Sequence, residues 1–420
     1  MNAFIPFLTF LAALNCSSVF ALKAQALTRP NILMIVADDL GVQDIRAKKQ
    51  EDFITPHIAA LAKTGVEFSR HYTAGDVCAP SRASILTGLY PQRLQYRIGH
   101  RGLSEEIPTV ADVFRENGYS THHVGKWHLG HEFYGTQLLD QGYDSFFGFF
   151  ISGHLKGDAD DNNPLGLGDT YINPYLVVDQ QRPKQFKGHL TELLTEEAAN
   201  VIATNSKDTP WFLSVWYFAP HAPLEAPEKW LQKYDGDPRR RYKGLLSVLD
   251  EGVERLLHTL RETGQASNTI VVFLSDNGAV DQRSNLPYIG ITNSFREEGV
   301  RTPLFFVWPD RLKPARIEHV VSSLDIYPTL ISLAGLHVPG RTDGKDLSLL
   351  MANNAIAPRP LFWEAYEVSN AGIQDEGLSF DFAILDSTGQ WRLVSENGDL
   401  SLFDLKQDPT GSMDVKRGNE

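Results

Sequence analysis

The sequence has 420 residues, 42% of them hydrophobic and 22% charged, which is ordinary globular composition with ample length for a large core. A formal net charge of −13 argues against a nucleic-acid partner, because phosphate backbones select basic surfaces. It does not exclude an anionic substrate, because only the local field of a pocket matters there.

The N-terminus has the pattern of a cleaved signal peptide. Residues 4–14 form an apolar run too short to span a bilayer, and Ala24-Gln25-Ala26 fits a small-x-small cleavage site. We expect residues 1–26 to be removed and the mature chain to be periplasmic or secreted. A lipoprotein anchored through Cys16 is the alternative, but Leu14-Asn15-Cys16 matches a lipidation box poorly. No other segment is long and apolar enough to cross a membrane.

Strands and helices alternate along most of the chain. Continuous apolar runs without polar alternation are typical of parallel strands buried on both faces, and they occur at 31–37, 211–217, 269–275 and 303–308. Helical patterns lie between them near 57–64, 109–117, 190–204, 240–263 and 323–334. This alternation predicts an α/β sandwich around a mostly parallel sheet.

Polar residues follow directly after three of these strands. They are Asp38 and Asp39, then His221, then Asp276 and Asn277. Ligands of open α/β sheets collect at the carboxyl ends of the strands, so we expect these side chains to converge on one crevice.

The character of the sequence changes after Gly335. Short apolar pieces at 382–385, 391–394 and 402–405 are separated by Gly, Asn and Asp turns, which favours a small antiparallel sheet. The predicted division is therefore a large domain at 27–335 and a smaller C-terminal subdomain at 336–420.

Cys78 is the only cysteine left once the leader is removed, so it cannot form an intramolecular disulfide. An unpaired thiol in an exported chain is incidental, intermolecular or chemically used. Pro80 suits the first turn of a helix, which places Cys78 at or just before a helix N-terminus, where exposed N–H groups favour an anion.

A series of motifs, in this order, resembles the signatures of the formylglycine-dependent (type I) sulfatases. They are Asp38-Asp39, Cys78-x-Pro80-Ser81-Arg82, Leu86-Thr87-Gly88, Gly125-Lys126-Trp127-His128, Pro220-His221-x-Pro223 and Ser275-Asp276-Asn277-Gly278. The resemblance covers residues 30–420 and implies the alkaline-phosphatase-like fold.

The resemblance implies that Cys78 is oxidised to formylglycine by a separate formylglycine-generating enzyme, which reads the Cys-x-Pro-x-Arg segment. The hydrated aldehyde then attacks the sulfur with one hydroxyl, and the second hydroxyl ejects sulfate by re-forming the carbonyl. The alternative for Cys78 is a buried structural cysteine, the commoner role of a free thiol.

Hard oxygen donors predict a metal site for calcium, with magnesium as the lesser option. These donors are Asp38, Asp39, Asp276 and Asn277, and the resemblance adds an oxygen of the modified Cys78. A single acidic residue after a strand is often only a turn or cap residue, but four together favour a metal.

The resemblance also implies roles for several polar residues around Cys78. Arg82 holds the diol or the metal-bound oxygen, Lys126 and His128 lie beside the diol and sulfate, and His221 protonates or contacts the leaving alcohol. Histidine suits that task because its pKa lies near neutral pH. Ser152 resembles a serine that contacts sulfate.

One position departs from the family pattern. The lysine that binds sulfate in relatives aligns with Thr292, upstream of Glu297-Glu298-Gly299-Val300-Arg301. Losing this cation from a desolvated site costs on the order of a few kcal/mol of transition-state stabilisation. Arg296 is the candidate for a substitute cation in substrate binding.

Other motifs favour structural roles. Residues 158–163 lack the Gly and Glu of a calcium loop and are typical of a solvated acidic loop. Trp127, Trp216, Tyr217 and Trp230 are candidates for sugar stacking, but core packing is favoured for Trp216 and Tyr217.

The sequence therefore predicts an exported sulfatase acting on sulfate monoesters of carbohydrates. Two alternatives remain open at this stage. One is a phosphodiesterase or phosphonate monoester hydrolase of the same fold, and the other is an impaired relative that only binds sulfated glycans. The intact set of Cys78, Lys126, His128 and His221 argues against the binding module.

Overall fold

The computed structural model describes residues 29–45, 54–94, 102–130, 137–151, 155, 168–206, 208–280, 287–288, 290–366 and 380–418. The predicted signal peptide and the acidic loop at 158–163 lie outside these ranges. Within the described ranges, the helices are all too short or too polar to span a bilayer.

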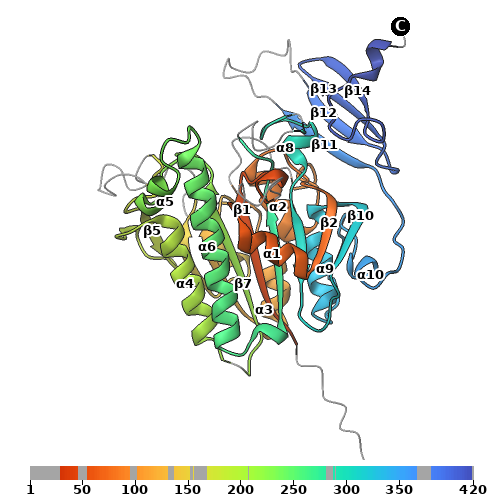
Figure 1. Cartoon of the computed structure of the whole chain (residues 1–420). Helices are drawn as coiled ribbons and strands as arrows, with labels where there is room; N and C mark the ends of the chain where they lie inside the picture. The colour runs from red at the N-terminus through yellow and green to blue at the C-terminus, as the bar shows by residue number, and fades with distance from the viewer. Residues whose placement is uncertain are drawn as a thin grey trace, which may run out of the picture.

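Ten of the described strands form one central sheet, in the order β10-β2-β9-β8-β1-β7-β3-β4-β5-β6 (Figure 1). The middle strands β8, β1, β7, β3 and β4 pair in parallel, as the alternation of strands and helices predicted. The strand bounds are β1 Asn31–Asp38, β2 Val66–Tyr72, β3 Ser120–Lys126, β4 Ser145–Phe149, β5 Tyr175–Val178, β6 Lys184–Gln185, β7 Trp211–Pro220, β8 Thr269–Ser275, β9 Leu304–Val307 and β10 Ala315–Ser322.

The prediction of a parallel strand at 303–308 was wrong in direction. β9 runs antiparallel to both of its neighbours, β8 and β2. Its four residues are all buried, because β9 lies inside the sheet with both faces covered. An apolar run indicates that a strand is buried on both faces, but it does not indicate the direction of the strand. An antiparallel strand inside the sheet is buried as completely as a parallel one.

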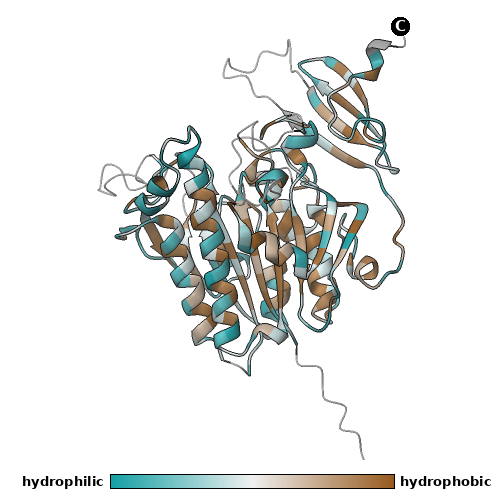
Figure 2. Ribbon diagram, viewed as in Figure 1, coloured by the Kyte–Doolittle hydropathy of each residue, from teal (hydrophilic) through white to brown (hydrophobic). Residues whose placement is uncertain are grey.

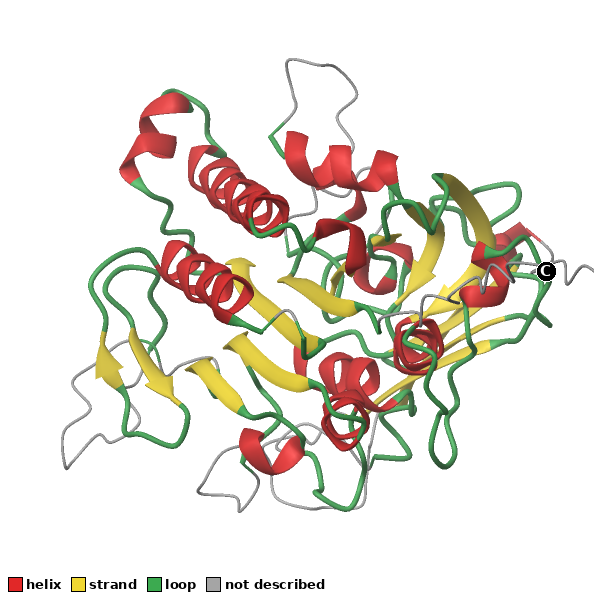
Figure 3. Cartoon of the chain, turned by 90° about the horizontal axis from the view of Figure 1, so that it is seen from below, coloured by secondary structure: helices red, strands yellow, loops and turns green. Residues whose placement is uncertain are grey.

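Helices cover both faces of the sheet, as Figure 3 shows. Leu33 and Ile35 of β1 belong to the core formed with α1, α4 and α6, whereas Ile32 and Met34 belong to the core formed with α2, α3 and α9. Successive side chains of a strand point to opposite faces, so β1 contributes to both cores. In Figure 2 the strands between the helices are largely brown, while teal residues lie on the outward sides of α4 and α6.

The five predicted helical segments all contain helices, and further helical segments are present in the described residues. The α-helices are α1 Pro56–Thr64, α2 Cys78–Thr87, α3 Val110–Glu116, α4 Leu190–Thr204, α5 Glu228–Lys233, α6 Arg240–Glu262, α8 Glu297–Val300, α9 Ile326–Leu333 and α10 Ser348–Met351. The 3₁₀ helices are η1 Val42–Ile45, η4 Leu138–Gln141, η5 Ala266–Asn268, η6 Ser323–Asp325 and η7 Val415–Gly418. α3 begins at a capping box, in which Thr109 and Asp112 satisfy each other's backbone N–H groups.

The C-terminal part of the described chain forms a separate antiparallel sheet, as predicted, in the order β11-β12-β13-β14. The strands are β11 Leu361–Tyr366, β12 Phe380–Leu385, β13 Trp391–Glu396 and β14 Asp399–Asp404. One face buries Trp363, Leu385 and Phe403 in a third core, together with Tyr72 of β2 and Phe295. The small sheet therefore packs on the main domain near the carboxyl end of β2 (Figure 1).

Candidate active site

Two parallel neighbours in the sheet bring the predicted acidic residues together. Ala37 of β1 is in register with Ser275 of β8, so the residues that follow them lie side by side at the sheet edge. Asp38, Asp39, Asp276 and Asn277 are all buried. The backbone N–H of Asp39 donates to Oδ1 of Asp276 at 3.3 Å, which joins the two strand ends directly.

Cys78 is the first residue of α2, with Val77 as the extended N-cap residue. Its Sγ lies 3.2 Å from Oδ1 of Asp38. One potential ligand atom from each of Asp38, Asp39, Cys78 and Asp276 lies within 4.8 Å of all the others. The helix start predicted from Pro80 is therefore correct, and it points the cysteine at the carboxylates.

Two fully buried cations hold this cluster. Arg82, one turn into α2, donates from Nε to Oδ2 of Asp276 at 2.8 Å and from Nη1 to the Lys126 carbonyl at 3.0 Å. Lys126, the last residue of β3, contacts Oδ2 of Asp38 through Nζ at 2.6 Å. Both side chains have no exposed surface, so each charge depends on its carboxylate partner.

The close packing behind Lys126 needs a glycine. A Cβ on Gly125, whose φ is +118°, would lie 1.9 Å from the carbonyl oxygen of Trp216 on β7. Only glycine combines that φ with such a close approach to the neighbouring strand. Gly125 thus lets β3 deliver Lys126 to the cluster.

The carboxyl groups of the cluster have different pKa values. Burial acts to raise the pKa of Asp38, but Lys126 and Arg82 outweigh it and hold that pKa well below its usual range. Burial, reinforced by the charge of Asp38, raises the pKa of Asp39 and of Asp276 to about 7. Additional positive charge at this point would favour the ionised form of both groups.

The thiol of Cys78 is not activated by this environment. Burial and the neighbouring charge of Asp38 raise its pKa well above the ordinary value. The unmodified side chain is therefore held as a thiol, which is not the nucleophilic form of cysteine.

Both predicted site histidines lie at this cluster. His221 follows β7, stacks on Phe218 with ring centroids 4.5 Å apart, and places Nε2 3.7 Å from Oδ2 of Asp39. Burial, together with Lys126 and Arg82, lowers the pKa of His128 well below its ordinary value. His128 has a φ of +63°, and Asp39 one of +65°. Such strained backbone in non-glycine residues is concentrated at functional sites.

Thr292, which the resemblance aligned with a lysine, contacts the predicted metal ligand Asn277. Its Oγ1 accepts a hydrogen bond from Nδ2 of Asn277 at 3.0 Å and donates to the carbonyl of Asp76 at 3.2 Å. Nδ2 of Asn277 also donates to Asp39. Oδ1 of Asn277 is buried without a hydrogen-bond partner among the described residues. Oδ1 of Asn277 therefore keeps a lone pair that can bind a cation.

Of the two predicted substrate-binding residues, the structure describes only Arg296, and it pairs Arg296 with a residue of the C-terminal sheet. The Arg296 guanidinium pairs with Glu396 of β13, with both Nε and Nη2 2.9 Å from Oε2. Ser152 lies outside the described residues. Both roles stay predictions.

Core packing is confirmed for Trp216 and Tyr217, which are fully buried. The prediction of Trp127 as a candidate for sugar stacking was wrong, because its ring is fully buried as well. Trp216 nevertheless faces the Arg82 guanidinium at 4.9 Å. Phe218 was missed by sequence reasoning, although its ring lies 5.4 Å from the Lys126 ammonium and stacks on His221. In the sequence it is one more apolar residue of a strand, so nothing set it apart.

Comparison with known proteins decides the family. The sulfatase family model matches residues 30–336, and the model for the N-sulphoglucosamine sulphohydrolase C-terminal region matches residues 293–419. The chain belongs to the sulfatase family. This places it in the alkaline-phosphatase-like superfamily and makes it a sulfuric ester hydrolase.

Individual sulfatases are similar over most of the chain. Mouse N-acetylgalactosamine-6-sulfatase is 30% identical over 374 residues, which is 83% of this chain and 71% of that protein. The crystal structure of Ps i-CgsB in complex with k-i-k-neocarrahexaose is similar with a TM-score of 0.78 and 29% identity, covering 93% of this chain and 89% of the other. The phosphonate monoester hydrolase of Agrobacterium radiobacter shares the fold, with a TM-score of 0.68, 20% identity and coverage of 93% and 92%.

Proposed function

We propose that this sulfatase hydrolyses sulfate monoesters of sulfated carbohydrates, with formylglycine derived from Cys78 as the nucleophile and calcium as the metal. The observation that carries the proposal is the convergence of Cys78 with three buried carboxylates, whose ligand atoms lie within 4.8 Å of one another. A relative of 29% identity has been crystallised with an oligosaccharide, k-i-k-neocarrahexaose, which supports a glycan as the substrate class.

The residues present fit a hard divalent cation. Asp38, Asp39 and Asp276 offer carboxylate oxygens, and the unpaired Oδ1 of Asn277 supplies a fourth buried oxygen donor. These residues would hold the ion, and the Sγ of Cys78 stands where modification would place an oxygen. A donor set of oxygens alone favours calcium or magnesium over zinc or copper.

When present, formylglycine supplies a hydrated aldehyde nucleophile, and calcium supplies positive charge that polarises the sulfate. The protein fixes the geometry around them. Arg82 and Lys126 lock Asp276 and Asp38 in place and keep positive charge beside the nucleophile. Because these groups are fully buried, their interactions act without competition from water.

His221 is suited to protonate the leaving alcohol. Its Nδ1 lies 2.5 Å from the carbonyl oxygen of Ala222, which can only accept, so Nδ1 carries a hydrogen. The other nitrogen, Nε2, is then the one that exchanges a proton. His221 remains partly exposed, with 24% of its side chain accessible, so a substrate can reach it. His128 stays neutral through its lowered pKa and serves as a hydrogen-bonding partner of the sulfate.

Export and the division of the chain belong to the same proposal. Removal of residues 1–26 would place the protein in an oxidising compartment, where a lone thiol that is not chemically used is uncommon. We propose a catalytic domain at 27–335 and a C-terminal subdomain at 336–420. N-terminal sequencing of the protein recovered outside the cytoplasm tests the cleavage site.

The function is tested by sulfate release from sulfated mono- and oligosaccharides, using protein co-expressed with a formylglycine-generating enzyme and supplied with calcium. Cys78→Ala is the blank. We expect sulfate release by the wild type alone. Faster hydrolysis of an aryl phosphodiester than of any sulfate ester would instead favour the phosphodiesterase alternative. Glycan binding without sulfate release would favour a binding module.

A further inference from the structure

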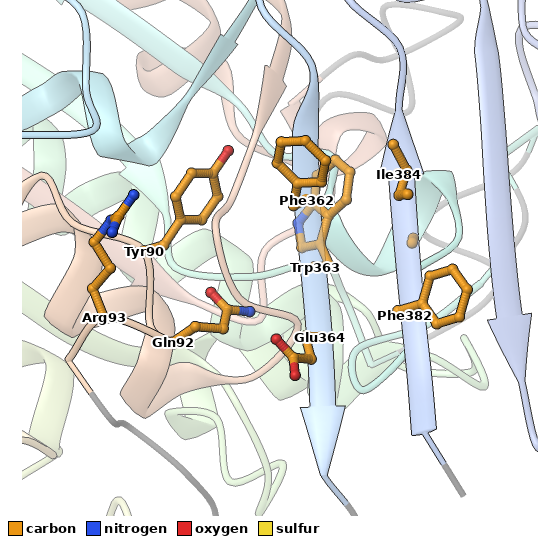
Figure 4. Close-up of a pocket in the computed structure, with 9 residues that line it drawn as sticks. Tyr90, Gln92, Arg93, Phe362, Trp363, Glu364, Phe382 and Ile384 are labelled. Atoms are coloured by element: carbon orange, nitrogen blue, oxygen red, sulfur yellow. The ribbon is translucent and has the colours of Figure 1, made fainter.

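A second concave site lies between the loop after α2 and the C-terminal sheet. The cavity has a volume of about 640 Å³, within the range of sites that bind small molecules. Its lining includes Tyr90, Gln92, Arg93, Phe362, Glu364 and Phe382. Figure 4 shows the Gln92 amide and the Glu364 carboxylate facing each other beside the aromatic rings. The predicted site residues do not include any of these six.

The cavity has the two surfaces that a sugar ring requires. Phe362 is 45% exposed, and its ring meets Tyr90 edge-on with centroids 6.3 Å apart, so an apolar face remains accessible. The side chains of Gln92 and Glu364 have no hydrogen-bonding or ionic partner among the described residues. Aromatic rings pack against the apolar face of a sugar, while the amide and carboxylate can bind its hydroxyls.

Among its described residues, the cavity lining offers no unpaired cation for a sulfate group. The cation on the rim, Arg93, is already paired, because its Nε lies 2.9 and 2.7 Å from the two carboxylate oxygens of Asp343. Glu364 leaves an unpaired carboxylate in the lining. Among the described lining residues, an anionic group would meet this carboxylate with no free cation to offset it, which favours an uncharged ring.

One short segment of the chain joins the wall of the cavity to Cys78. The indole N–H of Trp363, which forms its inner wall, donates to the carbonyl of Thr73 at 2.7 Å. Thr73 lies five residues before Cys78. On the other side, α2 leads from Cys78 to Tyr90, and its ten residues span about 15 Å. This span is longer than one sugar ring, so a ligand that reached both sites would have to be an oligosaccharide.

We propose that this cavity is a subsite for an unsulfated sugar unit of the same glycan whose sulfated unit lies at Cys78. The proposal rests on the proposed function for the identity of the glycan. The subsite would make the protein prefer oligosaccharides over small sulfate esters, because the distant ring adds binding that a short substrate lacks.

Binding is tested by calorimetry on the Cys78→Ala protein with a panel of uncharged oligosaccharides that includes chemically desulfated neocarrahexaose. We expect at least one of them to bind, and Phe362→Ala to weaken that binding about tenfold. The matched control is Trp391→Ala, because Trp391 is 41% exposed on the same sheet but does not line the cavity. Absence of binding across the panel, or equal loss in both variants, overturns the subsite.

Kinetics separate this proposal from the proposed function. With active protein, Phe362→Ala and Glu364→Gln should raise KM for the best sulfated oligosaccharide about tenfold and leave kcat/KM for an aryl sulfate unchanged. Equal effects on both substrates would contradict the subsite. If the wild type releases no sulfate from any ester, the proposed function fails, while the calorimetric result still decides whether the cavity binds a neutral sugar.

Discussion

Thr292 shapes the surroundings of Asn277, one of the predicted metal ligands. The hydroxyl of Thr292 bridges the Asn277 amide and the Asp76 carbonyl. This contact fixes the amide so that Oδ1 stays without a hydrogen-bond partner among the described residues and keeps a lone pair for a cation. We therefore expect Thr292 to act by orienting the predicted metal ligand Asn277.

Replacing Thr292 tests that role. Thr292→Val keeps the shape but removes the acceptor for Nδ2 of Asn277, so we expect calcium affinity, measured by calorimetry, to fall about tenfold. Thr292→Ser retains the hydroxyl and should restore most of the affinity. Equal affinity in all three proteins would show that the hydroxyl does not orient the ligand.

His71 predicts a pH dependence of stability remote from the site. It is fully buried on β2, and Nδ1 lies 2.9 Å from Oγ1 of Thr302. Burial lowers its pKa to about 3. Between pH 6.5 and 3 the unfolded chain binds a proton that the folded chain does not, so this histidine makes stability fall as the pH falls.

We expect the wild type to lose about 2 kcal/mol more unfolding free energy between pH 7 and pH 5 than His71→Gln does. Urea denaturation at the two pH values measures this difference, and contributions common to both proteins cancel. Parallel pH profiles for the two proteins would rule out the assignment.

At the scale of elements, the sequence predicted the site better than it predicted the sheet. Asp38 and Asp276 were expected to meet because they end buried strands, and parallel strands share a carboxyl edge. β3 was not predicted, because Ser120–Lys126 contains two histidines and no apolar run. Its His123 is buried beside Trp127 and Trp216, a tertiary environment that no local pattern reports. The direction of β9 was missed for the same reason.

α8 links the candidate site to the C-terminal sheet. A Cβ on Gly278, next to Asn277, would lie 1.7 Å from the Glu298 carbonyl oxygen. The backbone of α8 therefore packs closely against the loop that carries the predicted metal ligand Asn277. Glu297 of α8 is buried and accepts hydrogen bonds from Arg392 of β13 at 2.8 Å and from Arg301 at 2.9 Å.

Removing one charge from this buried network should be costly. We expect Glu297→Gln to lower the free energy of unfolding by about 3 kcal/mol, because the buried Arg392 and the partly buried Arg301 lose their counter-charge. The control is Asp235→Asn, which breaks the exposed pair with Arg240 and should cost less than about 1 kcal/mol. Similar losses in urea denaturation would contradict the distinction between buried and exposed pairs.

At the scale of the whole molecule, the central sheet has helices on both faces and carries the candidate active site, and the small C-terminal sheet packs beside it. The large architecture could be predicted because apolar runs and helical periods are local properties of the chain. The partner of Arg296 and the cavity beside Phe362 could not, because both depend on how the C-terminal sheet docks. We expect the docked sheet to determine which glycan is accepted and the main sheet to determine the reaction.

The central claim is that Cys78 acts only after conversion to an aldehyde. The most direct measurement is the sulfate-release rate of preparations in which peptide mass spectrometry gives different converted fractions of Cys78. We predict that the rate is proportional to the aldehyde fraction and vanishes for protein that carries only the thiol. Full activity with Cys78 present entirely as the free thiol would contradict the account.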